Sequence, residues 1–310
     1  MISFDIVTDD RFTEIAQGLS RSASHDLGIE EETVYAFVEG LLADFTETVD
    51  PEEEVAVCYY GECLLFRIYS EGYFFPCPLG LHGDADIGEA LIALSDYTRR
   101  ELIPLSLTDV PRELLDTLTD LFPHVDAAAY EDDEDSFFVR VCTECDMLET
   151  VPTLTEGELT LDALRPEDGE DYCRLSTDPE VNRYWGYDYS EDRPEADADY
   201  FLDVAEVEFN TGIALSFAVR QAGVFVGEAV IFDFDHRGSA MIAVRLLPER
   251  HGRGIGTATV RLLMRAAESI GLTLLRAEVM EKNVASIRMT ERLMDRTGVT
   301  DGRVQFALAL

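Results

Sequence analysis

The chain has 310 residues, of which 46% are hydrophobic, and its 63 acidic residues far outnumber its 24 lysines and arginines. A net charge of −39 repels a phosphate backbone, which argues against nucleic acid as a partner. The chain has no run of about 20 apolar residues and no basic-then-apolar N-terminus, so we expect a cytoplasmic protein with no membrane partner. Its length favours two domains, each with its own core.

Residues 1–150 are the more acidic half, with 35 acidic and 7 basic residues against 28 and 17 in residues 151–310. The hydrophobic pattern of this first half predicts an acidic α/β domain. The predicted strands are 4–7, 55–60 and 63–69, followed late in the domain by two strands on either side of an acidic turn at 131–135. The predicted helices are 12–22, 32–44, 87–99 and a last one that begins at Pro111 and ends before Pro123.

An acidic, proline-containing stretch between Ser136 and Thr155 predicts the linker, and we place the domains at 1–150 and 151–310. Cys142 and Cys145 form a CxxC pair within it, a spacing found in zinc and redox sites. No second pair or nearby histidine completes a ligand set, so we expect reduced thiols and no metal.

The second half alternates short strands with amphipathic helices. The predicted strands are 158–164, 213–220, 224–234, 240–247, 273–280 and 303–310. The predicted helices are 166–175, 179–185, 196–209, a helix that ends at Ile270, and one that begins at Asn283. In the helix 196–209 we expect an apolar inward face, with the acidic side chains of Asp203, Glu206 and Glu208 turned outward.

A loop with Gly252, Gly254 and Gly256 lies between an apolar strand and an amphipathic helix. The first N–H groups of a helix have no partner within it, and glycines let a bulky anion approach them, so a diphosphate can bind there. Arg253 adds a positive charge and Thr257 a hydroxyl donor. The loop has neither the spacing of a dinucleotide fold nor the Gly-Lys-Ser/Thr of a P-loop.

This loop resembles motif A of the GNAT acetyltransferases, whose usual form is Gln or Arg, two residues, Gly, one residue, then Gly or Ala. Here it reads HGRGIG from His251, which departs from the family in its first position. The segment LTLDALRPEDGEDYCRLSTDPEVNRYWGYDY resembles the opening of the Rim-type ribosomal-protein acetyltransferases, and EVMEKNVASIRMTERLM resembles their motif B. The resemblance spans residues 153–310 and implies acetyl-CoA as the cofactor.

Cofactor-binding residues follow from that resemblance. It implies that the backbone of Val244, Arg245, Leu246 and Leu247 lines the pantetheine arm. It implies that the diphosphate is held by His251, Gly252, Arg253, Gly254, Ile255, Gly256 and Thr257. Asn283 and Ser286 would also contact the cofactor. The residues alone allow other roles, with Asn283 as a helix cap, Ser286 as a surface hydroxyl and Arg253 as a solvated loop charge.

Acetyl transfer to an amine needs a group that accepts a proton and donors for the developing oxyanion. Relatives often place a carboxylate on the fourth or fifth strand, and the fourth-strand position is Met241 here. Glu278 on the fifth strand is the favoured base, with surface pairing to Arg276 as its alternative role, and Asp233 is the second candidate. The tyrosine that many GNAT enzymes use as an acid falls at Thr290.

The acceptor is expected at the helices within 179–209, where aromatic and acidic residues alternate. Tyr184, Trp185 and Tyr187 are the predicted substrate-binding residues, because such a pocket suits a cationic amine. A packed helical cap would have the same composition. The acceptor would be a small-molecule amine or a protein N-terminus.

The first half weakly resembles the N-terminal part of the lysyl-phosphatidylglycerol synthase catalytic domain, a tandem of GNAT-like folds. We therefore predict two GNAT-like α/β domains in tandem, each a mixed, mostly antiparallel sheet flanked by helices. Gly80, Gly83 and Gly88 echo a glycine loop, but Asp84 and Asp86 stand where a phosphate would bind. This half is expected to have lost acyl-CoA and to serve specificity, homodimer formation or support.

The leading hypothesis is an N-acetyltransferase in which the amine attacks acetyl-CoA directly within a ternary complex. The alternative is a non-catalytic acyl-CoA-binding sensor or interaction protein, which Met241 and Thr290 favour because acid–base groups are missing there. A third possibility, an aminoacyl transferase using charged transfer RNA, conflicts with the charge of the chain.

Overall fold

The computed structural model describes residues 87–310 apart from 132 and 186–196. Before residue 87 it describes 2–7, 17, 20, 21, 24, 30–36, 39–40, 55–60, 63–69 and 73–76. The chain divides into two compact units, Met1–Val141 and Cys142–Leu310. The predicted glycine loop at 80–86 and the predicted substrate contact Tyr187 lie outside the described residues. In the described part of the chain, no helix has the length and apolar character needed to cross a membrane.

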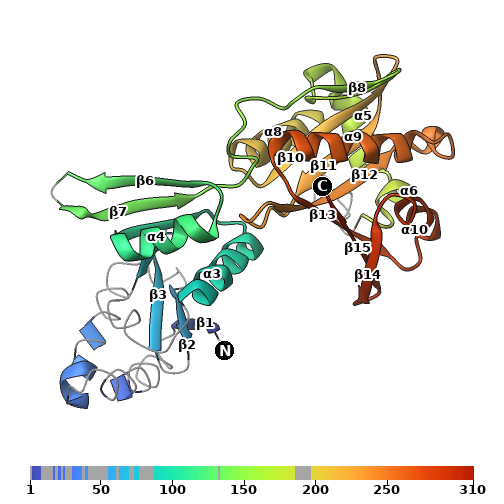
Figure 1. The fold of residues 1–310 in the computed structure, drawn as a ribbon. Helices are drawn as coiled ribbons and strands as arrows, with labels where there is room; N and C mark the ends of the chain where they lie inside the picture. Colours follow the sequence, from blue (N-terminus) through green and yellow to red (C-terminus); the bar gives the residue numbers. More distant parts are fainter. Residues whose placement is uncertain are drawn as a thin grey trace. The chain divides into compact units, whose positions relative to one another are not determined.

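The N-terminal unit contains one seven-stranded sheet in the order β1-β2-β3-β4-β5-β7-β6. Its strands are β1 (Ile2–Val7), β2 (Val55–Tyr60), β3 (Cys63–Tyr69), β4 (Tyr73–Pro76), β5 (Leu105–Pro111), β6 (Val125–Tyr130) and β7 (Asp133–Val141). Every neighbouring pair is antiparallel except β4 and β5. Helix α3 (Ile87–Glu101) connects that parallel pair, and α4 (Arg112–Leu121) follows β5 (Figure 1).

The C-terminal unit contains an eight-stranded sheet in the order β14-β15-β13-β12-β11-β10-β9-β8. Its strands are β8 (Leu154–Glu156), β9 (Leu159–Asp162), β10 (Ala214–Gln221), β11 (Val224–Phe232), β12 (Ser239–Leu246), β13 (Leu274–Met280), β14 (Asp295–Thr300) and β15 (Arg303–Ala309). Its helices are η2 (Pro166–Asp168), α5 (Gly169–Thr177), α6 (Pro179–Asn182), α8 (Ala198–Asn210), η3 (Pro248–Arg250), α9 (Ile255–Ile270) and α10 (Val284–Thr290).

The two sheets repeat one topology. Each begins with an antiparallel meander, contains a single parallel pair joined by a helix, and ends with its last strand inserted beside the parallel pair. A parallel pair requires a long crossover, which α3 provides in one unit and α9 in the other. The predicted fold class, two mixed and mostly antiparallel sheets flanked by helices, is confirmed.

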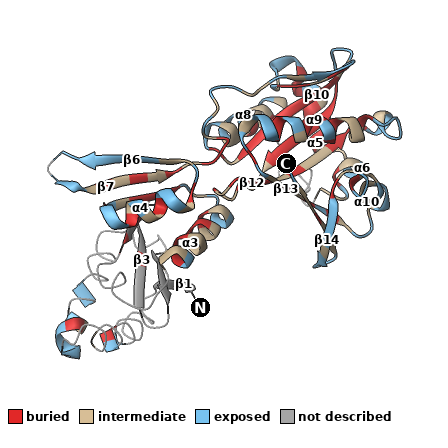
Figure 2. Cartoon of the chain, in the orientation of Figure 1, coloured by how far each residue is buried: buried red, intermediate tan, exposed pale blue. Residues whose placement is uncertain are grey.

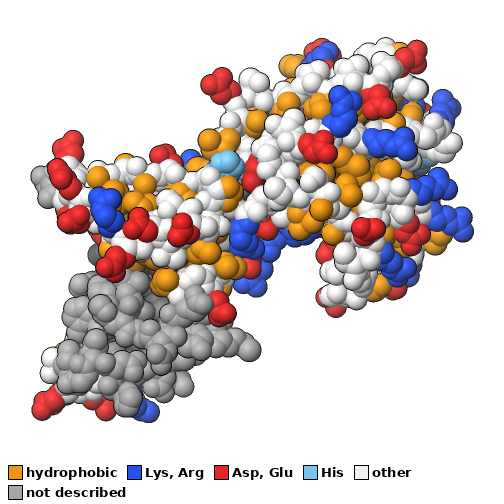
Figure 3. All heavy atoms as spheres, viewed as in Figure 1, with side chains coloured by type: hydrophobic (Ala, Val, Ile, Leu, Met, Phe, Trp, Pro, Cys, Tyr) orange, Lys and Arg blue, Asp and Glu red, His pale blue; other side chains and the backbone are white. Residues whose placement is uncertain are grey.

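Helices cover both faces of the C-terminal sheet, whose central strands β10 and β11 are largely buried (Figure 2). Helix α9 packs on one face through Ile255, Leu262, Leu263 and Ala266. Helices α5 and α8 pack on the other through Tyr172, Leu175, Phe201 and Ala205. On the face in Figure 3, arginines are frequent over the C-terminal unit, in line with the uneven charge of the sequence.

Several predicted elements need correction. Strands β4, β5, β8 and β14 were not predicted, since each is short or lies beside a helix of stronger pattern. The acidic run 131–135 is not simply a turn, because β7 already begins at Asp133 with exposed acidic side chains. The second unit begins at Cys142, and the Cys145 thiol is buried, with Sγ 3.8 Å from the carbonyl oxygen of Ala214. Burial raises the pKa of Cys145 to about 12.

A buried ion cluster ties the start of α5 to the sheet. Arg220 is 4% exposed and donates from Nε to Asp162 at 2.7 Å. It also donates two hydrogen bonds of 2.6 Å to Asp168, whose carboxylate accepts the Arg165 N–H as well. Because both carboxylates are buried, their burial depends on paired cations: Arg220 contacts both, and Arg165 also pairs with Asp162.

Replacing Arg220 with methionine should therefore lower the free energy of unfolding of the C-terminal unit by roughly 3–5 kcal/mol. Urea unfolding followed through the fluorescence of Trp185, the single tryptophan of the chain, would measure it. The control is Arg174→Met, which removes exposed ion pairs of 3.1 Å to Asp171 and Glu249 and should cost less than about 1 kcal/mol. Equal losses in the two variants would contradict the assignment.

Candidate active site

The candidate site begins where β12 and β13 separate. Their parallel pairing covers only Ser239–Met241 against Leu274–Arg276, although both strands continue beyond it. Past Met241, β12 keeps its pairing with β11, and β13 keeps its pairing with β15. A gap between two strands of one sheet is therefore part of this fold.

The register of β11 and β12 shows which backbone groups face this gap. The Leu247 N–H donates to the Val226 carbonyl at 3.0 Å, so odd-numbered residues of β12 form the hydrogen-bonded pairs with β11. The backbone N–H and C=O groups of Ile242, Val244 and Leu246 therefore point toward the gap. Apart from the Leu246 carbonyl, which lies 2.9 Å from His251 Nε2, these groups form a row of donors and acceptors that an extended, amide-containing ligand can use.

The glycine loop continues from the end of that row. Residues 251–254 are exposed, and Gly252 and Gly254 have φ values of 71° and 80°, in the region that favours glycine. No atom lies within 4 Å of the position that a Cβ would take on either glycine. Gly254 caps α9, so the N–H groups of Ile255, Gly256 and Thr257 have no carbonyl partner within the helix.

Contacts at both ends of the loop connect it to β12 and to α10. The imidazole Nε2 of His251 lies 2.9 Å from the Leu246 carbonyl oxygen, which links the loop to the end of β12. A Cβ on Gly256 would lie 3.2 Å from Met289 Sδ, so this glycine lets α10 pack on the first turn of α9. Arg253 is exposed and forms no ion pair within the described part of the chain.

Asn283 and Ser286 lie together at the start of α10. Asn283 Oδ1 accepts the Ser286 N–H at 3.2 Å, which makes Asn283 the N-cap of the helix. The cap uses the oxygen of the side-chain amide and leaves its N–H donors for another partner. The structure thus brings these two predicted contacts together and gives Asn283 a structural role in addition.

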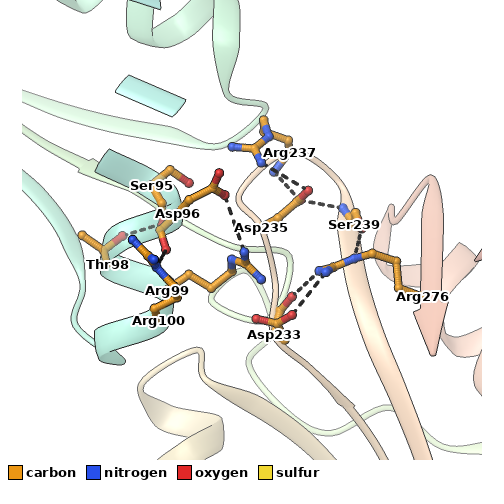
Figure 4. A network of polar contacts seen from close by, with 10 residues as sticks. All are labelled: Ser95, Asp96, Thr98, Arg99, Arg100, Asp233, Asp235, Arg237, Ser239 and Arg276. Carbon is orange, nitrogen blue, oxygen red and sulfur yellow. Dashed lines mark hydrogen bonds and ion pairs between the residues drawn. The ribbon is translucent and has the colours of Figure 1, made fainter. Parts of the chain in front are cut away.

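The two predicted bases have different surroundings. Glu278 is exposed, and its carboxylate lies 3.7 Å from Arg303 and 3.4 Å from Gln305 Nε2. The predicted pairing of Glu278 with Arg276 is wrong. Arg276 instead binds Ser239 Oγ at 2.7 Å and both the carboxylate and the carbonyl oxygen of Asp233 (Figure 4).

A buried polar cluster on the α5 face escaped sequence reasoning. Glu228 of β11 and Arg245 of β12 are directly opposite in the register, and their side chains bond at 2.6 Å. Tyr172 donates its hydroxyl to Glu228 at 2.6 Å. Arg245 also donates to Asn182 and Ser176 at 3.0 Å. Two opposite charges inside apolar strands were the available signal, but pairing them requires the register.

The aromatic residues predicted at the acceptor site are only partly brought together. Trp185 lies over the Arg245 guanidinium, 4.5 Å from carbon to ring centroid, and so borders the buried cluster. Tyr184 stacks instead with Arg183 at 5.2 Å. Both rings are partly buried.

Glu208 needs a correction. It was expected to face outward, but it is half-buried, on the face of α8 that carries Phe201 and Ala205. It lies within electrostatic range of Glu228, Arg245 and Tyr172. Burial, and then the charge of Glu228, raises the pKa of Glu208. Its spacing, seven residues after Phe201 and three after Ala205, was the signal for this position.

The family profile described as "Acetyltransferase (GNAT) domain" matches residues 158–293. This range contains the gap, the glycine loop and the start of α10. The C-terminal unit is a GNAT acetyltransferase domain. A search of curated protein sequences finds no match to the chain.

Similar solved structures fall on about half of the chain. Mycobacterium smegmatis RimJ in complex with CoA-disulfide shares 20% identity, with 49% of this chain and 81% of that chain covered and a TM-score of 0.43. Spermidine N-acetyltransferase from Vibrio cholerae, in complex with CoA and spermine, shares 17%, with 50% and 96% covered and a TM-score of 0.43. RimL, a ribosomal L7/L12 alpha-N-protein acetyltransferase, shares 15%, with 52% and 94% covered and a TM-score of 0.41.

The position of β12 in the GNAT domain depends on Gly227. A Cβ there would lie 2.3 Å from the Arg245 carbonyl oxygen and 2.7 Å from Leu246 Cδ2, so β12 would have to move. Gly227→Ala should destabilise the unit by about 1–3 kcal/mol, measured by thermal unfolding. The control is Gly298→Ala, whose Cβ would be 3.4 Å from Gln305 Oε1 and should be nearly neutral. Similar stabilities for the two variants would show that the close approach is not needed.

Proposed function

We propose that the GNAT domain moves an acetyl group from acetyl-CoA to a primary amine, which attacks the thioester directly in a ternary complex. One observation carries the proposal: the gap-facing backbone groups of β12 are followed along the chain by the exposed loop 251–254 and by the unpaired N–H groups of the first turn of α9. A coenzyme A thioester has the matching order of groups, with an extended amide arm followed by a diphosphate.

The diphosphate would bind the N–H groups of Ile255, Gly256 and Thr257, with Arg253 adding a positive charge. The pantetheine arm would pair with the gap-facing groups of Ile242, Val244 and Leu246, and the first turn of α10 would contact the cofactor through Asn283 and Ser286. This arrangement would place the acetyl group at the end of the arm, where β12 and β13 begin to separate. A backbone N–H of β12, at Val244 or nearby, would then stabilise the oxyanion.

The amine must lose a proton before or during its attack on the acetyl carbon. Of the two carboxylates predicted for this step, Asp233 is already engaged by Arg276 at 3.2 Å. Glu278 lies on β13, across the gap from β12, and its contact with Arg303 at 3.7 Å is long and exposed. Glu278 is therefore the better supported of these two. The acceptor in this proposal arrives as a cation, either a polyamine or a protein N-terminus, and contacts the partly buried aromatic rings of Tyr184 and Trp185.

The function is tested by titrating acetyl-CoA into the full chain in a calorimeter and by following thiol release with a panel of amines. The panel comprises spermidine, spermine, an aminoglycoside and short peptides with a free N-terminus. We expect saturable binding, and thiol release that depends on one class of amine. Binding without turnover on any amine would favour an acyl-CoA sensor, and no binding would reject the proposal.

The loop itself is tested by Gly254→Ala. An alanine at φ 80° is strained by roughly 1–2 kcal/mol and carries a methyl group beside the proposed diphosphate site. We expect acetyl-CoA to bind at least about tenfold more weakly, which calorimetry would measure. Gly271→Ala is the matched control, because Gly271 has φ 96° at the opposite end of the same helix and should carry similar strain. An equal loss of affinity in both variants would mean that strain alone is responsible.

A further inference from the structure

We infer that Glu208 of α8, rather than either carboxylate predicted from the sequence, takes the proton from the acceptor amine. The inference rests on the proposed function and assigns a catalytic residue to it. It starts from the position of Glu208 on the inward face of α8, beside the buried cluster of Glu228, Arg245 and Tyr172.

The path of the chain from α8 into β10 shows which residues of the sheet lie beneath Glu208. After α8 the chain turns at once into β10, with the Ile213 N–H bonded to the Glu208 carbonyl oxygen at 2.9 Å. Helix α8 therefore runs back over β10, and Glu208 lies above the first residues of that strand. Ala205, one turn earlier, shares a core cluster with Ala218 further along β10.

The register of the strands shows which residues of β11 and β12 lie opposite the first residues of β10. Ser216 of β10 is opposite Val230 of β11, which is opposite Ala243 of β12. The pairing of β12 with β13 ends at Met241, and Ala243 lies two residues further along β12, at the place proposed for the acetyl group. Side chains in this row share the α5 and α8 face with Glu228 and Arg245, because they lie two positions away along each strand.

Ala243 is the point at which an incoming molecule can reach this row, because it is partly exposed, whereas Ser216 and Val230 are buried. Two strand spacings of about 4.8 Å separate β10 from β12, a distance that a glutamate side chain and an amine, or one bridging water, can cover. The two carboxylates predicted from the sequence fit less well, because Asp233 is held by Arg276 and Glu278 is exposed.

The chemistry suits a half-buried carboxylate. Glu208 lies within electrostatic range of Glu228 on β11, Arg245 on β12 and Tyr172 on α5, and no hydrogen bond of its carboxylate is found within the described residues. Its burial raises its pKa, which makes it a stronger base than an exposed carboxylate. Glu228 cannot serve, because Arg245 and Tyr172 occupy its two oxygens.

In the proposed step the acceptor enters as an ammonium ion and gives one proton to Glu208. The neutral nitrogen bonds to the acetyl carbon, and the carbon–sulfur bond breaks. The leaving thiolate takes up the second nitrogen proton through solvent, and Glu208 releases its proton to water. The products are the N-acetyl amine, coenzyme A and one proton.

The test compares Glu208→Gln with Glu206→Gln, an exposed carboxylate two residues earlier on the same helix. Thiol release from acetyl-CoA is followed from pH 5 to 10, with the amine of the panel that the wild-type protein uses best. We expect Glu208→Gln to bind acetyl-CoA normally and to lose about 10²- to 10⁴-fold in kcat/KM near neutral pH. The deficit should shrink as pH rises, because free amine needs no base. Glu206→Gln should behave as wild type.

Each outcome decides the inference. A kcat/KM of Glu208→Gln within twofold of Glu206→Gln at every pH would overturn it, and so would a loss of acetyl-CoA binding, which would indicate a structural role. If Glu208→Gln does not fold, Glu208→Asp replaces it and must move the acidic limb of the pH profile. A deficit in Glu278→Gln alone would assign the base to Glu278. If wild type acetylates no amine, the proposed function itself fails, which is a distinct result.

Discussion

The candidate site depends on the early end of one parallel pairing. Strands β12 and β13 share only three residue pairs before β13 leaves with β15 and β12 stays with β11. A strand edge inside a sheet is costly unless water or a ligand satisfies its backbone groups. The crossover helix α9 begins beside the end of β12, and it therefore presents its unpaired N–H groups at the same edge.

Electrostatics explain why an anion could bind to so acidic a chain. With a net charge of −39, long-range attraction of a diphosphate is absent, and affinity must come from donors in direct contact. Backbone N–H groups at a helix start act at that range and need no cationic side chain. The acidic side chains would instead favour a cationic acceptor. Backbone N–H groups would then bind the anionic cofactor and acidic side chains the cationic acceptor, at different points of the same domain.

Parts of the site whose residues are close together in the sequence were predictable, whereas contacts between residues far apart in the sequence were not. The strand, glycines and helix of the diphosphate loop lie within about 30 consecutive residues, and their pattern was sufficient to predict them. The cluster of Tyr172, Glu228 and Arg245 joins residues up to 73 positions apart through a register that no local pattern encodes. Glu208 was assigned to the surface because it is charged, although its helical spacing placed it inward.

The first unit has the same strand order, but its parallel pair offers less to a ligand. Within the described residues, strand β4 has four residues against eight in β12, and it pairs with β5 at Tyr73 and Phe74. It ends at Pro76, which has no N–H to donate and is buried. Strand order is set by short connections and crossover geometry, whereas binding is set by the groups exposed at the gap. A shared strand order therefore does not imply a shared ligand, and the loss of acyl-CoA from this half stays a prediction.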